Sequence, residues 1–220
     1  MSDFEPDYLS ENEWEDNGDL AWNEFDWELY LREQERSISR YLGFYEALKA
    51  SPDRIDEVAD RMGWDRADTD EAEERENPER ALFADDIYTL QKNPVYIATK
   101  ALFLSLRRSW ESVAAQPGLV PQPLALSFLA SIHECEEQAV MAIHALDFGD
   151  YAMAICLFKR AMAGLNDCFA AVGSESAGAH PAVRACRDDL RMRLFDLREI
   201  WLRVISDCRE DSNRPADEED

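Results

Sequence analysis

A single cluster of histidine and carboxylate side chains lies between residues 133 and 144. His133 and Glu137 are four residues apart, so on a helix they are separated by one turn, roughly 6 Å, and could share a metal ion. His144 lies about 16 Å beyond His133 and cannot join that pair. A di-iron bundle needs Glu-x-x-His on two helices, and no glutamate here has a histidine three residues later. We therefore expect no metal and no other cofactor, and keep a metal-binding or enzymatic bundle centred on His133, Glu136 and Glu137 as an alternative.

Glu136 is the second group that could do chemistry. On a helical wheel it falls between Leu129 and Ile143, inside the apolar arc of its helix. A buried carboxylate must be either paired or protonated. Three arrangements follow, in order of expectation: a head group that reaches water at the edge of the arc, an ion pair with an arginine of a neighbouring helix, or a protonated acid in a pocket.

Other catalytic signatures are missing from the sequence. It contains no GxxxxGK[ST], GxGxxG, HExxH or GxSxG motif. Its five cysteines (135, 156, 168, 186 and 208) include no CxxC pair, so neither a zinc knuckle nor a dithiol redox site is indicated. We expect buried free thiols in a reducing cytoplasm, and a protein that is not an enzyme.

The overall charge restricts the partners. The 220 residues carry 47 Asp and Glu against 23 Lys and Arg, a formal net charge of -24. Such a surface repels the phosphates of nucleic acids and of anionic lipids, so we expect neither nucleic-acid nor membrane binding. The sequence has no apolar run of about 18 residues and no basic region followed by an apolar stretch at its start, so we expect a cytoplasmic protein.

The acidic residues are concentrated at the two ends. Residues 1–90 carry 28 acidic and 9 basic side chains, whereas residues 91–209 carry 13 of each. This distribution predicts an acidic arm (1–20), N-terminal helices (21–64), a charged linker (65–93), a neutral bundle (94–209) and a disordered acidic tail (210–220).

The neutral segment has the apolar period of four helices, expected at about 94–115, 123–146, 150–172 and 181–209. Pro94 and Pro181 each suit the first turn of a helix, and Pro117-Gly118 ends the first one. Apolar residues of the third helix recur with alternating spacings of four and three, as in a coiled-coil seam. No segment alternates with period two. We therefore predict an all-α fold, an antiparallel up-down four-helix bundle, with further helices at about 22–49 and 51–63.

One stretch resembles a known repeat. The pattern Gly149-Asp150-Tyr151, Ala154-Ile155, Phe158 and Ala161 is similar to the turn and second helix of a tetratricopeptide repeat. The resemblance covers about 30 residues (135–165), and no second copy follows at an offset of 34 residues. It implies peptide binding in a concave groove if the repeat is genuine, and otherwise a well-packed helical hairpin within the bundle.

Two features point to protein binding. Aromatic side chains interrupt the acidic N-terminal region at Trp22, Phe25, Trp27 and Tyr30, and arginines line one face of the last helix at Arg184, Arg187, Arg191 and Arg198. We predict a protein–protein interaction or scaffold module that binds a partner or a second copy of itself, with the four aromatic residues and Arg184, Arg187 and Arg191 as contacts. The acidic N-terminal segment could lie across the arginine face. A further alternative is an acidic mimic of nucleic acid formed by residues 1–90.

Overall fold

The computed structural model describes residues 23–64, 92–116, 118–174 and 180–213. These residues form six helices and no strand, so the prediction of an all-helical fold is confirmed for them. The helices are α1 (Glu24–Ala47), α2 (Arg54–Met62), α5 (Pro94–Ala114), α6 (Gln122–Asp147), α7 (Tyr151–Gly173) and α8 (Pro181–Asn213). The predicted acidic arm (1–20), Trp22, residues 65–91 of the predicted linker and residues 214–220 of the predicted tail lie outside the described residues.

The helix starts follow from local side chains. At α5, the Asn93 side chain accepts a hydrogen bond from the Tyr96 backbone at 3.0 Å, and Pro94 occupies a position whose N–H has no helical partner. At α7, Asp150 accepts from the Met153 backbone at 2.9 Å, after Gly149 has turned the chain with a φ of 73°. These are the positions at which the sequence predicted helices to begin.

The two N-terminal helices are shorter than predicted. α1 begins directly after its N-cap, Asn23. Asn23 forms a capping box with Asp26, in which the side chain of each residue accepts a hydrogen bond from the backbone N–H of the other. α2 begins at Arg54, after an N-cap at Asp53, and not at the predicted Ser51. The Ser51 hydroxyl instead accepts from the Asp53 backbone at 3.3 Å and donates to Glu57, so residues 51–53 form a turn before the helix.

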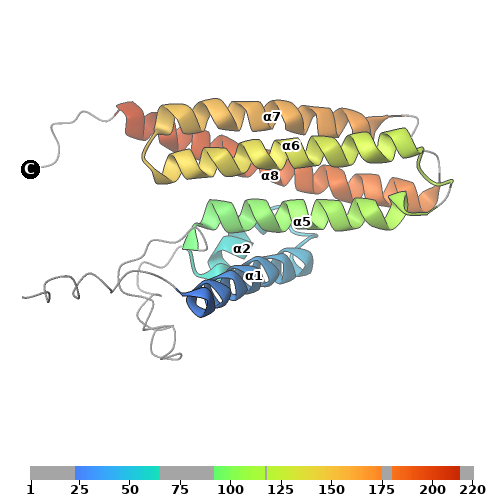
Figure 1. Cartoon of the computed structure of the whole chain (residues 1–220). Helices are drawn as coiled ribbons and strands as arrows, with labels where there is room; N and C mark the ends of the chain where they lie inside the picture. Colours follow the sequence, from blue (N-terminus) through green and yellow to red (C-terminus); the bar gives the residue numbers. More distant parts are fainter. Residues whose placement is uncertain (1–22, 65–91, 117, 175–179, 214–220) are drawn as a thin grey trace, which may run out of the picture.

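The four C-terminal helices lie lengthwise beside one another, with α1 and α2 along the α5 side (Figure 1). α6 contacts α5 and α7, α8 contacts α7 and α5, and α1 contacts α5 and α2. Trp201 of α8 lies in the core between Phe103 and Phe158, with ring centroids 6.0 and 6.1 Å away. Its indole N–H donates to Thr99 Oγ1 at 3.1 Å, which satisfies the polar end of this fully buried ring.

Among the described helices, none combines the length and the apolar character needed to cross a bilayer.

Candidate functional site

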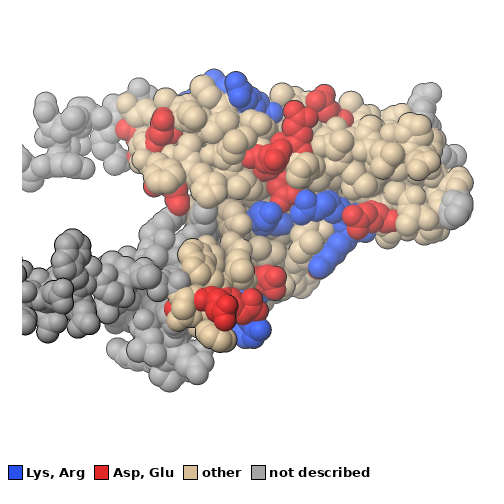
Figure 2. Space-filling view, viewed as in Figure 1, with Lys and Arg blue, Asp and Glu red and all other residues tan. Residues whose placement is uncertain are grey.

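Glu136 on α6 is buried, with 5% of its surface exposed, and its carboxylate lies between two cations of α5. Lys100 Nζ contacts Oε1 at 2.6 Å and the Arg107 guanidinium contacts Oε2. Lys100 and Arg107 are seven residues apart, so both lie on the same face of α5, two turns from each other. On the face seen in Figure 2, basic side chains of α5 meet acidic side chains of α6 along the line between these helices.

This arrangement is the second of the three expected for Glu136, with a lysine added to the arginine. The side chains of Lys100 and Arg107 are about one-third exposed, at 30% and 32%, so their outer ends remain hydrated while Glu136 is not. A buried carboxylate with two cationic partners fixes the relative position of α5 and α6. Burial raises the pKa of the Tyr96 phenol on the same helix as these cations. A hydrogen bond with Gln34 lowers that pKa, and the negative charge of Glu136 adds a smaller increase.

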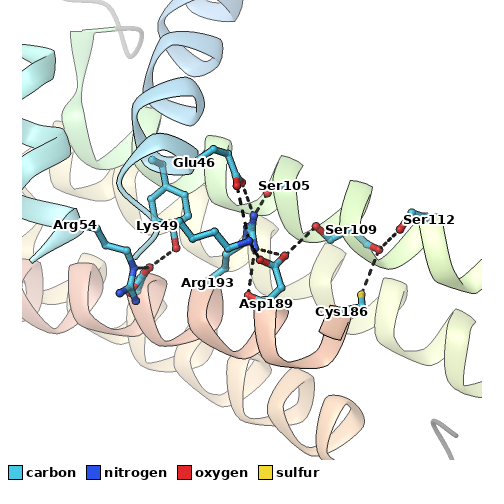
Figure 3. Close-up of polar contacts among 11 residues, drawn as sticks. Glu46, Lys49, Arg54, Ser105, Ser109, Ser112, Cys186, Asp189 and Arg193 are labelled. Carbon is cyan, nitrogen blue, oxygen red and sulfur yellow. Dashed lines mark hydrogen bonds and ion pairs between the residues drawn. The ribbon is translucent and has the colours of Figure 1, made fainter. Parts of the chain in front are cut away.

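A second polar network joins the N-terminal helices to α8 (Figure 3). Its centre is Arg193, which is 2% exposed. Arg193 Nε donates to Ser105 Oγ of α5 at 2.7 Å, and its two terminal nitrogens bind Glu46 of α1 and Asp189 of its own helix. The guanidinium also lies 5.8 Å from the ring centroid of Tyr45. One buried cation therefore connects three helices.

Asp189 receives a second cation, because Lys49, just beyond α1, also binds its carboxylate. Ser109 of α5 donates to the same carboxylate at 3.3 Å. Burial raises the pKa of Asp189, but the hydrogen bonds and charges of Arg193 and Lys49 outweigh burial and leave that pKa below its ordinary value.

After Glu136 and Arg193, Asp196 is the third buried charged side chain, and it lies about one turn of α8 after Arg193. Arg54 of α2 binds both of its oxygens, and the Tyr45 hydroxyl donates to one of them. Burial, followed by the hydrogen bond to Asp196, raises the pKa of Tyr45, and burial raises the pKa of the neighbouring Tyr41. Both phenols therefore stay neutral at physiological pH, and Tyr45 acts as a donor.

Sequence reasoning missed Arg193 and Asp196, although Arg193 carried a usable signal. On a helical wheel Arg193 falls inside the apolar arc of α8, between Leu197 and Ile200. Its partner Glu46 lies 147 residues earlier in the chain, and Arg54 lies 142 residues before Asp196, so no local spacing connects either pair.

The candidate metal ligands do not converge. His133 and Glu137 are exposed on α6, as is His144. Within the described ranges, no group of three or more His, Cys, Asp or Glu side chains is placed to hold a metal ion.

Four of the cysteines lie within the packed helices. Cys135 Sγ donates to the Ala161 carbonyl at 3.1 Å, and burial raises the pKa of Cys135, Cys168, Cys186 and Cys208. Such thiols are poor nucleophiles because little thiolate forms at neutral pH. Cys156 is exposed on α7.

The predicted aromatic contacts lie at the start of α1. Phe25 is 75% exposed and Trp27 is 52% exposed, while Tyr30 is half-buried and packs edge-on against Trp27 with centroids 5.8 Å apart. Leu31, which sequence reasoning did not single out, is 48% exposed.

The arginine face of α8 lies beside the end of α7. Arg187 Nε donates to the Val172 carbonyl at 2.5 Å, so it satisfies one of the carbonyls left open at the C-terminus of α7. Arg191 forms an ion pair of 3.7 Å with Asp188, and Arg184 and Arg198 are exposed. The acidic residues of α1 and α2 that bind α8 do so through Arg193 and Arg203, which lie outside this face.

Comparisons with protein-family models, with curated proteins and with solved structures find no match to this chain.

Proposed function

We propose that this chain is a non-enzymatic protein-binding module, in which α5 to α8 form an antiparallel up-down four-helix bundle and the first half of α1 binds a partner. The contacts of α6 with α5 and α7, and of α8 with α7 and α5, support a closed ring of four helices. The buried ion pairs of Arg193 with Glu46 and of Arg54 with Asp196 support a rigid attachment of α1 and α2 to that bundle. No tetratricopeptide array is needed for this function.

The apolar face of α1 carries the proposal, because it continues beyond the part of the helix that the bundle covers. Trp27, Leu31, Ile38, Tyr41 and Tyr45 lie within about 80° of one another on the helical wheel. Tyr41 and Tyr45, at the C-terminal end of this face, are at most 1% exposed. Leu31, three turns earlier, is 48% exposed, and none of residues 23–40 is buried.

The first half of α1 is therefore helical with little tertiary support. Its local stabilisation comes from the capping box at Asn23 and from ion pairs such as Arg32 with Glu28, at 2.8 Å. Such exposed pairs contribute only a few tenths of a kcal/mol each, and isolated helices of this length are marginal in water. A partner that covers Trp27 and Leu31 would supply the apolar burial that this part of the helix lacks.

The charge of the same segment indicates the chemistry of the partner. Residues 24–36 contain five acidic and two basic side chains. An amphipathic helix with an apolar face and basic flanks would complement them. A second copy of this chain is disfavoured, because two molecules of net charge -24 repel each other.

Affinity capture with quantitative mass spectrometry tests the proposal. The baits are the wild-type chain, Leu31→Glu, and the matched control Phe148→Ser, which removes the 87% exposed side chain of the residue that follows α6. We expect a protein with a basic amphipathic segment to bind wild type and F148S, and to bind L31E about tenfold less tightly when the purified proteins are titrated.

Equal capture of every protein by wild type and L31E would overturn the proposal. So would a dimer of this chain, seen by light scattering, that L31E dissociates, because the occupant would then be a second copy. Since Leu31 is half-exposed, L31E should keep the helical circular dichroism of the wild type.

A further inference from the structure

The seam between α7 and α8 carries an apolar patch on its outer side. Phe169 of α7 packs against Phe195 of α8, with ring centroids 4.7 Å apart and planes at 47°. Despite this contact Phe195 is 56% exposed, and Leu202, two turns further along α8, is 43% exposed. Met162, two turns before Phe169, is only partly buried. Because α7 and α8 run in opposite directions (Figure 1), Met162 and Leu202 occupy the next position of the same seam.

Basic side chains border this patch. Arg191 and Arg198 lie within about 60° of Phe195 on the wheel of α8, one turn before and one turn after it. Arg198 forms no ion pair with the described residues, and neither does Lys159, which lies on α7 one turn before Met162. The nearby acids are Asp188, paired with Arg191, and Glu199, paired with Arg203. The patch is thus apolar and has positive charges at its border, although the chain as a whole carries a net charge of -24.

The complementary segment belongs to the same chain. Residues 1–22 contain eight acidic side chains, no lysine or arginine, and four aromatic rings at Phe4, Tyr8, Trp14 and Trp22. This segment ends at Asn23, the N-cap of α1. Its 22 residues span up to about 75 Å when extended, longer than the roughly 50 Å of the 33-residue α8.

We propose that the α7–α8 seam around Phe169, Phe195 and Leu202 binds the acidic, aromatic residues 1–22 of the same molecule. The aromatic rings cover the apolar patch, and the carboxylates approach Arg191, Arg198 and Lys159. The tether keeps the segment at an effective concentration in the millimolar range, which favours it over a second copy that must overcome the repulsion between two acidic molecules. The contact is independent of the partner-binding face of α1.

Carbodiimide cross-linking of the full chain tests this contact directly, because the reagent joins carboxylates to amines that touch. Lys159 is the sole lysine of α7 and α8, so a cross-link from it to an acid of residues 1–22 reports the seam. We expect this cross-link in the wild type, with a yield that falls about tenfold in Phe195→Ser/Leu202→Ser and also in 1 M salt. Phe148→Ser, the matched control, should keep the wild-type yield.

A mixture of ¹⁴N- and ¹⁵N-labelled protein identifies the source of the segment. Cross-linked peptides of uniform label place it in the same molecule, as proposed. Mixed-label peptides would assign it to a second copy and overturn the proposal. The absence of any cross-link from Lys159 to residues 1–22, or a yield that the double variant leaves unchanged, would overturn it as well.

Discussion

The guanidinium of Arg54 on α2 meets the carboxylate of Asp196 on α8 along its edge, with Nε donating to Oδ2 at 2.8 Å and Nη2 to Oδ1 at 2.6 Å. Both side chains are largely buried, at 16% and 6% exposed. This two-point contact orients the short helix α2 against the bundle, which a single hydrogen bond would not do.

Removing Arg54 should therefore be costly. In Arg54→Ala, Asp196 remains buried with only the Tyr45 hydroxyl as a partner, and we expect a loss of ~3 kcal/mol in the free energy of unfolding. Urea denaturation measures it. Arg203→Ala is the matched control: Arg203 pairs with Asp56 on the same two helices, but its side chain is 47% exposed, so its loss should cost ~1 kcal/mol or less. Equal effects of the two substitutions would contradict this account.

Glu136 should stabilise the contact between α5 and α6. In Glu136→Gln the neutral amide leaves Lys100 and Arg107 without their shared anion, although both keep access to water, so we expect a loss of about 2 kcal/mol. The exposed neighbour Glu137 provides the control, and Glu137→Gln should change stability by less than about 0.5 kcal/mol. Chemical denaturation of both variants at neutral pH tests this prediction. An E136Q variant as stable as the wild type would show that the carboxylate charge is not needed.

Gly164 should be required where α6 and α7 approach closely. A Cβ added there would lie 3.2 Å from Cys135 Cβ and 3.4 Å from Cys135 Cα, whereas a Cβ at Gly43 on α1 would meet nothing within 4 Å. Gly43→Ala should thus stabilise the protein by about 0.5–1 kcal/mol through helix propensity alone. Gly164→Ala should lose that gain to overpacking and be at least about 1 kcal/mol less stable than G43A. Thermal unfolding compares the two, and equal stabilisation by both would show that the helices separate readily.

Acid should weaken the attachment of the N-terminal helices through Asp189. Its folded-state pKa is lower than the ordinary 3.8, so the stability that it contributes is complete well above pH 3.8 and is lost as the pH falls through the folded value. Asp189→Asn should flatten this acid limb in a plot of unfolding free energy against pH. An acid limb that is as steep in D189N as in the wild type would assign the loss to other carboxylates.

The helices were predictable because each is specified by residues close together in the sequence. Pro94 and Asn93 start α5, Gly149 and Asp150 separate α6 from α7, and the apolar period marks the buried faces. The predicted limits of α5, α6 and α7 differ from those observed by one residue or less at each end. The wheel also singled out Glu136, because an acid within an apolar arc is visible from its own helix alone.

The partners of the buried charges were decided by the tertiary structure. Lys100 and Arg107 come to Glu136 from another helix, and Arg54 comes to Asp196 from 142 residues away. A helix specifies which of its own side chains share a face, through the rise and rotation of the backbone. It does not specify which neighbouring helix supplies the counter-charge, because that choice depends on how all the apolar faces pack at once.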